Sequence, residues 1–334
     1  MRAPVGRGRP LLGYGLVGVA SFLGGVNAIL GKVVMTSGGL TPERVSQLRA
    51  AGAALVLLVA VALFDRRKVF FTRREVAFLA VFGVFGLAAA QFLYYTSLQR
   101  VPVGPALLIV NFAIVLVAVW ARFFGGGRVQ RRLWLAIALT LVGLSLLAQV
   151  WRGLAFDAVG IGAALLAAFT YAFYILVAER GVHAGRHGFF LVAWGFFFAS
   201  AFWAIAEPWW TFPYHLLGAR VSLLGALSDW TAPVWLLFGP IIPFTIATFA
   251  LPAAALRYLP ATRVVIVAVL EPVFGALVAF VWLDESLALV QLAGGVLVLA
   301  GVLAAATARA LDAGPGAVGE DLYDGLAYTG ETAP

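Results

Sequence analysis

The chain has 334 residues, of which 63% are hydrophobic and 11% charged, whereas soluble globular domains carry roughly 25% charged residues. Too little polar sequence remains to cover a soluble core, which excludes most soluble enzymes and nucleic-acid-binding proteins and predicts a membrane protein. The formal charge of +8 comes from basic residues between long apolar runs, a pattern that indicates membrane topology. Because the chain has no cysteine, disulfides, thiolate catalysis and cysteine-ligated metals are excluded.

Ten apolar stretches have about the 20 residues that a helix needs to cross the hydrocarbon core. Each stretch is continuously apolar instead of alternating, which predicts helices and not the strands of an outer-membrane barrel. The sequence therefore predicts an all-α membrane protein. The predicted helices cover 11–35, 45–64, 75–98, 103–124, 133–151, 159–179, 189–206, 234–256, 261–283 and 288–307.

Lysine and arginine are distributed unevenly between the two sides of these predicted helices. Most of the 23 basic residues fall in the N-terminal segment and in alternate connections, above all 65–74 and 125–132. The positive-inside rule then places both termini in the cytoplasm, which predicts a multi-pass protein of the cytoplasmic (inner) membrane. Residues 1–10 would form a short cytoplasmic N-terminus. Residues 308–334, rich in glycine, proline and acidic residues, would form a disordered cytoplasmic tail.

The two halves of the chain match each other, at a shift of 147 residues near the start of each half and 158 near its end. Matched pairs include Gly13 and Gly160, Phe22 and Phe169, Leu98 and Leu256, Pro102 and Pro260, and Gly143 and Gly301. This duplication predicts two five-helix repeats, 11–151 and 159–307. Since five is odd, the second repeat would enter the membrane from the opposite side. Inverted repeats of this kind are typical of transporters that work by alternating access.

Several short segments resemble those of a known family. They are Gly24-Gly25-Val26-Asn27, Tyr94-Tyr95-Thr96-Ser97-Leu98, Leu270-Glu271-Pro272-Val273 and Leu283-Asp284-Glu285-Ser286-Leu287. With them the chain resembles the EamA-type ten-helix transporters of the drug/metabolite transporter superfamily. The resemblance implies a secondary transporter, usually an exporter of small metabolites such as amino acids, with a central cavity between the repeats. The first repeat departs from the pattern, because Ala113 stands opposite Glu271 and Gly127 opposite Glu285.

Glu271 is the one acidic residue predicted near the middle of the membrane. It follows Pro260 by 11 residues, about 16 Å along a helix. A carboxylate at that depth is costly to ionise, so it could bind a proton, or a substrate amine when charged. Alternatively, Glu271 stays protonated and bonds a neighbouring helix, while Pro272 only kinks its own helix. The sequence favours neither of these two interpretations of Glu271 over the other.

Uncharged polar groups inside the predicted helices either line a cavity or join helices. We predict that Asn27, Tyr94, Asn111 and Tyr174 line a substrate cavity together with Glu271, and an aromatic lining suits an amphipathic or aromatic metabolite. Three other charged side chains, Lys32, Arg49 and Glu179, lie near predicted helix ends. Headgroup contact explains Lys32 and Glu179 best, and interfacial anchoring is favoured for Arg49 over pairing with an anionic substrate or with Glu43.

The sequence offers little for other functions. It contains no Gly-x-Ser-x-Gly elbow, no His-Glu-x-x-His motif and no phosphate-binding loop. We therefore predict a carrier of a small organic molecule embedded in the lipid bilayer, with proton coupling through Glu271, and no enzyme activity, cofactor, metal or nucleic-acid partner. The alternative is an intramembrane enzyme or a lipid-handling membrane protein built on the same helix bundle.

Overall fold

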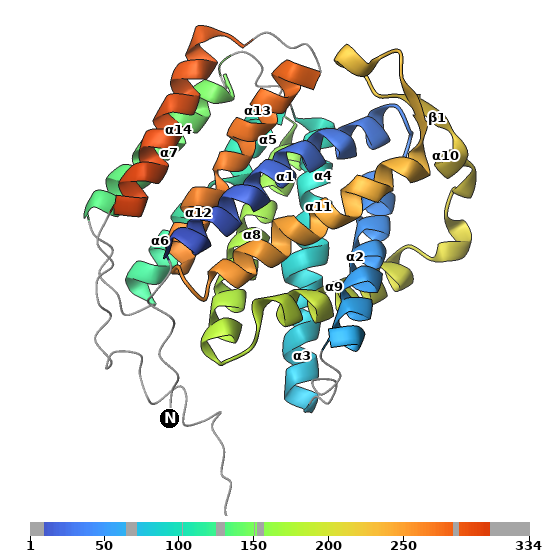
Figure 1. Ribbon diagram of the computed structural model, residues 1–334, viewed down its shortest axis with the longest axis horizontal. Helices are drawn as coiled ribbons and strands as arrows, with labels where there is room; N and C mark the ends of the chain where they lie inside the picture. The colour runs from blue at the N-terminus through green and yellow to red at the C-terminus, as the bar shows by residue number, and fades with distance from the viewer. Residues whose placement is uncertain are drawn as a thin grey trace, which may run out of the picture.

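The structure, a computed structural model, describes residues 10–64, 72–101, 103–124, 131–149, 151, 157–282 and 287–307. Within them the chain forms a bundle of long helices (Figure 1), so the all-α prediction is confirmed. The first repeat holds α1 (Pro10–Thr36), α2 (Pro42–Phe64), α3 (Arg73–Val81), the π-helix η2 (Phe82–Ala88), α4 (Ala89–Arg100), α5 (Val103–Val110), α6 (Ala113–Phe123) and α7 (Arg131–Leu147). The second holds α8 (Ala158–His183), α9 (Gly188–Ala206), α11 (Val234–Ala255), α12 (Ala261–Ala268), α13 (Leu270–Trp282) and α14 (Leu289–Thr307).

Some sequence predictions fall on residues that the structure does not describe. The predicted tail 308–334, nearly all of the N-terminal segment 1–10, and the segments around Gly127 and Glu285 lie outside the described residues.

Nine helical stretches of the described residues are long and apolar enough to cross a membrane. The tenth predicted helix, 133–151, corresponds to α7, which has 17 residues and is about 25 Å long. It ends at Leu147 instead of residue 151, because Gln149 adopts a left-handed backbone with φ 46° that an α-helix cannot continue through. The chain is a multi-pass membrane protein.

Helices α7 and α14 form the most extensive helix pair of the described residues, and glycines make it close. A Cβ atom added at Gly143 would lie 2.7 Å from both the Gly294 carbonyl oxygen and the Val298 nitrogen. Lipid tails are as apolar as side chains, so helices in membranes associate through such close packing of small residues. These glycines therefore allow the close contact of α7 and α14.

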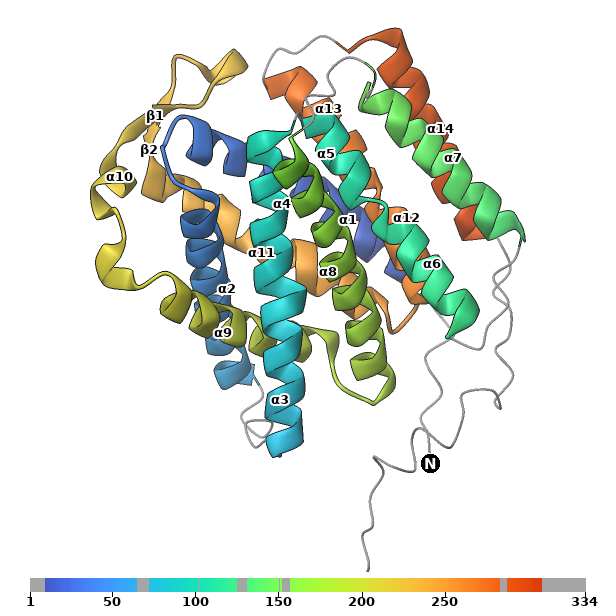
Figure 2. The same cartoon turned by 180° about the vertical axis from the view of Figure 1, so that it is seen from behind.

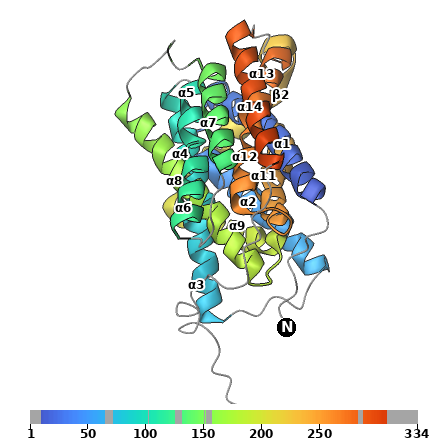
Figure 3. The same ribbon diagram turned by 90° about the vertical axis from the view of Figure 1, so that its left-hand side faces the viewer.

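The two repeats are interleaved, because each one lends its first helix to the other. Helix α1 packs on α11, α12 and α13, whereas α8 packs on α4, η2, α5 and α6. Figure 3 shows these two groups of helices on opposite sides of the molecule. The pairs α2–α9 and α7–α14 join corresponding helices of the two halves. Exchanging the repeats maps these contacts onto one another, as expected for two five-helix units related by a pseudo-two-fold axis.

Two of the predicted helices are present as membrane-spanning stretches, but each contains a short break. The predicted helix 103–124 is interrupted at Asn111 and Phe112, and the predicted helix 261–283 at Val269. Both breaks fall at the same place in their repeats, 158 residues apart. Pro272 cannot donate a backbone hydrogen bond within its helix, and Asn111 Nδ2 donates to its own helix at Leu107 O, 2.8 Å away, a competitor of the backbone pattern.

The long connection 207–233, between α9 and α11, has structure of its own. It contains the 3-10 turns η4 (Trp209–Thr211) and η5 (Gly225–Leu227), the short helix α10 (Tyr214–Gly218), and an antiparallel hairpin of β1 (Arg220–Ser222) and β2 (Thr231–Pro233). Trp210 and Trp230 are 84% and 69% exposed, in keeping with an interfacial location. A hydrogen bond from Trp282 Nε1 to Leu223 O, 2.9 Å long, ties this segment to α13.

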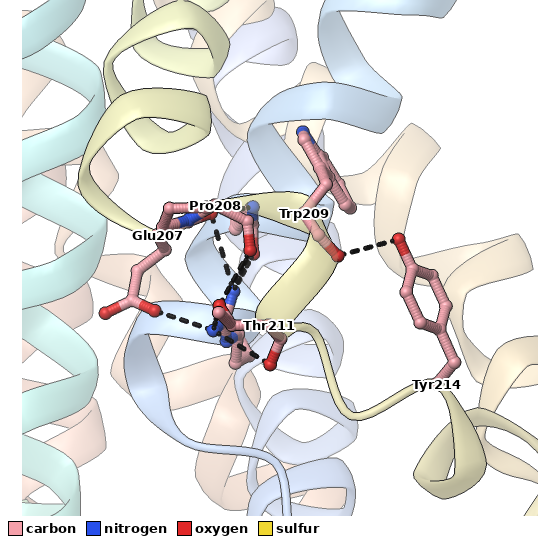
Figure 4. Close-up of polar contacts among 7 residues, drawn as sticks. Glu207, Pro208, Trp209, Thr211 and Tyr214 are labelled. Carbon is pink, nitrogen blue, oxygen red and sulfur yellow. Dashed lines mark hydrogen bonds and ion pairs between the residues drawn. The ribbon is translucent and has the colours of Figure 1, made fainter.

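Arg44, in the first turn of α2, fastens this segment to the bundle. Its guanidinium forms an ion pair with Glu207 Oε2 at 2.8 Å and donates to Thr211 Oγ1 at 2.7 Å. Figure 4 shows Glu207, Pro208 and Thr211 gathered around these contacts, and the Tyr214 hydroxyl bonded to Trp209 O. The arginine is 8% exposed. The ion pair between Arg44 and Glu207 therefore joins the start of α2 to the end of α9.

The α7–α14 contact gives a first prediction. Replacing Gly143 by alanine should destabilise the protein by about 1–3 kcal/mol, because the new Cβ would meet backbone atoms of α14 that cannot turn aside. Gly162, on α8, has no heavy atom within 4 Å of an added Cβ, so Gly162→Ala should keep or slightly raise stability. Thermal unfolding of both variants in the same detergent compares them. A Gly143→Ala variant that melts with the wild type would contradict this packing.

Candidate functional site

A small cavity lies inside the bundle where α1, α2, α4, α11 and α13 converge. Its volume is about 20 Å³, roughly the space of one water molecule, so the helices are closed around it. Residues from both repeats line it. They are Gly24, Asn27, Ala28, Arg49, Tyr94, Tyr95, Thr248 and Glu271.

Glu271 is held against α1 by a glycine contact. A Cβ at Gly24 would lie 2.9 Å from the Glu271 carboxyl carbon, and a Cβ at Gly25 would lie 2.7 Å from the Gly275 nitrogen. Glu271 also lies in the first turn of α13, directly after the break at Val269. This helix therefore presents a carboxylate to the cavity close to its break.

Arg49 is the residue whose role the sequence analysis missed. The interfacial interpretation is wrong, because the side chain is 5% exposed and lines the cavity. Helix α2 begins at Pro42 instead of residue 45, which puts Arg49 about 10 Å into the helix. Its guanidinium lies over the Tyr95 ring, 4.9 Å from the centroid. An arginine inside an apolar run was the available signal, but sequence position does not reveal which helix face is buried.

Asn27 connects the guanidinium to α11. In the amide orientation that satisfies both of its polar atoms, Asn27 Oδ1 accepts a hydrogen bond from Arg49 Nη2 at 3.0 Å and lies 3.2 Å from Thr245 Oγ1. Thr245 itself donates to Ile241 O at 2.7 Å. Helices α1, α2 and α11 are thereby joined around the arginine.

Several buried polar atoms at this site have no hydrogen-bond partner in the described part of the chain. They are Arg49 Nε and the hydroxyl oxygens of Tyr94 and Tyr95. Buried polar groups in proteins are almost always satisfied, since an unsatisfied one costs free energy. These atoms are therefore available to hydrogen-bond a molecule that enters the cavity.

The five residues predicted to line a substrate cavity do not all meet. Asn27, Tyr94 and Glu271 do line this one, whereas Asn111 and Tyr174 are not among its lining residues. The Tyr174 hydroxyl donates to the Phe249 carbonyl, and its ring is fully buried. Asn111 lies at the break between α5 and α6 and bonds within its own segment.

The two remaining charged residues have different surroundings. Lys32 is exposed, as expected for a side chain that reaches the headgroups. Glu179 is instead partly buried, and its Oε1 accepts a hydrogen bond from the Ala261 nitrogen at 2.7 Å. That bond satisfies a donor at the start of α12, so Glu179 supports the second broken helix from α8.

The cavity offers one carboxylate, one guanidinium and tyrosine hydroxyls. Glu271 and Arg49 line the same cavity, and in the described part of the chain no direct ion pair joins them. No group of three or more His, Cys, Asp or Glu side chains among the described residues is placed to hold a metal ion. The site is thus suited to binding a small molecule with groups of both charges.

Comparisons with known proteins agree with this architecture. The sequence profile of the EamA-like transporter family matches the chain twice, over residues 11–149 and 158–307. An uncharacterized transporter of Archaeoglobus fulgidus is 29% identical over 224 residues, which cover 66% of this chain and 74% of the relative. The uncharacterized transporter YdfC of Bacillus subtilis is 24% identical over 264 residues, 79% of this chain and 81% of the relative.

One solved crystal structure, described only as that of a protein, superposes with a TM-score of 0.65 at 19% identity, over 92% of this chain and all of the other. At this identity the likeness shows the fold alone. The two profile matches together span most of the chain. The chain therefore belongs to the EamA-like transporter family, within the drug/metabolite transporter superfamily.

Proposed function

We propose that this transporter exports a small organic metabolite, an amino acid or a similar amphipathic compound, by alternating access and in exchange for protons at Glu271. The observation that carries the proposal is that Glu271 and Arg49 both line one internal cavity. Charged side chains inside a membrane are expensive and are usually retained for function. A zwitterion would place its amine on the carboxylate and its carboxylate on the guanidinium, which binds carboxylates through two parallel N–H donors.

Tyr94 and Tyr95 support the same class of substrate. Their rings lie edge to face, 5.4 Å apart, and both line the cavity beside Arg49. Their hydroxyls supply polar contacts and their rings apolar ones. An aromatic or aliphatic side chain on the substrate can therefore be accommodated once the closed cavity opens.

The interleaved repeats support alternating access. If residues 11–151 and 159–307 act as the two exchanging units, an inward-open and an outward-open state have similar energies, as rocking between repeats requires. The chemistry is not symmetrical, however, since Ala113 takes the place of Glu271 in the first repeat. The second repeat would then hold the carboxylate that binds and releases the proton, while both repeats would change conformation during transport.

We further propose the cytoplasmic membrane as the location, with both termini in the cytoplasm. The arginine-rich connections support this orientation. It assigns the Glu207–Pro233 segment and its exposed tryptophans to the outer face.

Binding can be tested by thermal unfolding of the purified protein with a set of matched ligands. We expect neutral amino acids to raise the melting temperature, because a ligand that binds only the folded state stabilises it. The corresponding amines, which lack the carboxylate, and the N-acetyl derivatives, which lack the amine charge, should bind about tenfold or more weakly, since a hydrogen bond to a charged group contributes roughly 1.5–3 kcal/mol.

The Arg49→Gln variant sharpens this test. It should bind an amino acid and its amine equally weakly, because the partner of the carboxylate is gone. Lys32→Gln removes an exposed charge of α1 and is the matched control, which should bind as the wild type does. If Arg49→Gln still preferred the amino acid to the amine, the guanidinium would not be the carboxylate site.

Proton coupling gives a separate prediction for Glu271→Gln in proteoliposomes. Glutamine has nearly the shape of a protonated glutamate but cannot release a proton or pair with the substrate amine. Counterflow of labelled substrate should therefore need a higher substrate concentration but remain measurable, while substrate-driven pH change is lost. Glu75→Gln is the control, because this carboxylate lies at the start of α3, paired with Arg186 at 3.1 Å, away from the cavity. A pH change that survives in Glu271→Gln would rule out coupling through this residue.

A further inference from the structure

A second hollow lies apart from the cavity, between α3 and α8. Its volume is about 360 Å³, within the roughly 300–1,000 Å³ of typical small-molecule sites. The surface is almost entirely apolar, with one charged side chain at its edge. The residues that line this α3–α8 groove are Ala77, Phe78, Val81, Phe173, Val177 and Arg180. None of them lines the central cavity.

The groove exists because α3 and α8 separate. Helices α4 and η2 pack along α8, whereas α3 packs on α9 instead, and Figure 2 shows α3 continuing below the helices that meet α8. The change falls at the π-helix η2 (Phe82–Ala88), a widened turn of the kind that marks functional sites in helices. Val81 is 47% exposed, so this side of the groove faces the lipid.

The end of the groove at Arg180, here called its mouth, has one basic lining residue, and two more arginines begin α3 on its other side. Arg180 lies three residues before the end of α8, with its guanidinium 5.1 Å from the centroid of the Trp120 ring. Arg73 and Arg74 are exposed in the first turn of α3. They precede Ala77 and Phe78 by four residues each, so they share the helix face that lines the groove.

The carboxylates near this mouth are already engaged. Glu75 is bonded to Arg186 at 3.1 Å and to the Thr72 backbone nitrogen at 3.0 Å. Glu179 accepts from Ala261 on the other side of α8. The mouth therefore keeps a net positive charge next to the apolar lining of the α3–α8 groove.

We propose that the α3–α8 groove binds an anionic phospholipid, with an acyl chain in the groove and the phosphate at Arg180, Arg73 and Arg74. The apolar lining matches a hydrocarbon chain, and arginine is well suited to phosphate because its planar fork donates two hydrogen bonds at once. Basic pockets between transmembrane helices are known to recognise anionic headgroups. A free phosphate ion would use the mouth but leave the apolar lining uncovered.

The proposal can be tested by native mass spectrometry of the full-length protein in detergent, titrated with phosphatidylglycerol or phosphatidylcholine of identical chains. We expect phosphatidylglycerol to bind more tightly, and Arg180→Gln to weaken it about fivefold. Arg122→Gln, which removes an exposed arginine of α6 outside the groove, is the matched control and should bind as the wild type does.

A second variant tests the apolar part of the site. Val177→Phe should fill the groove and weaken phosphatidylglycerol binding while leaving all arginines in place. Thermal unfolding in lipid-free detergent verifies that each variant is folded, and Val177→Leu replaces it if Val177→Phe is not. Excess inorganic phosphate should fail to displace the lipid.

Three results would overturn the proposal. Equal losses in Arg180→Gln and Arg122→Gln would indicate general attraction to a basic surface. Equal binding of the two lipids would remove the role of the arginines. Displacement by inorganic phosphate would identify a site for the free anion. Because none of these measurements depends on a transported substrate, they leave the proposed function untouched.

Discussion

Where α1 crosses α13, glycine allows two backbones to approach so closely that no other residue would fit. Gly25 packs on Gly275, and Gly24 packs on the carboxyl group of Glu271. In a membrane there is little hydrophobic gain from bringing helices together, so such van der Waals contact is a principal source of association. The crossing joins α1, from the first repeat, to α13, from the second repeat. It also determines where the Glu271 carboxylate lies. The rest of the cavity is arranged around this contact.

The buried arginine depends on that arrangement. A guanidinium away from water requires compensation, and Arg49 receives it from the Tyr95 ring and the Asn27 amide. Gly31 permits this, since a Cβ there would lie 2.7 Å from the Tyr95 hydroxyl oxygen. Glycines of α1 therefore serve both charged residues, Glu271 through Gly24 and Arg49 through the position of Tyr95.

The helix breaks add a constraint that acts on both repeats. Because α5–α6 and α12–α13 are interrupted at equivalent places, each half has one membrane-spanning helix with a break within it, and discontinuous helices are a feature of transporter binding sites. Only the break between α12 and α13 is followed by a carboxylate, that of Glu271. The two repeats therefore have similar backbones but different charges at this place. The α3–α8 groove lies beside a third irregularity, the π-helix η2, which follows α3 directly.

The sequence by itself determined the membrane class, the helical fold and the duplication, because these follow from hydropathy, helix length and the order of matched residues. It selected Asn27, Tyr94 and Glu271 as candidate cavity residues because they are polar groups inside apolar helices. It did not predict the breaks at Asn111 and Val269, the hairpin of 220–233, or the burial of Arg49. It also grouped Tyr174 and Asn111 with a cavity that their side chains do not line. Only the tertiary structure decided these points, because in a uniformly apolar helix no polar pattern marks the face that turns inward. That choice is made by the helices that pack against it.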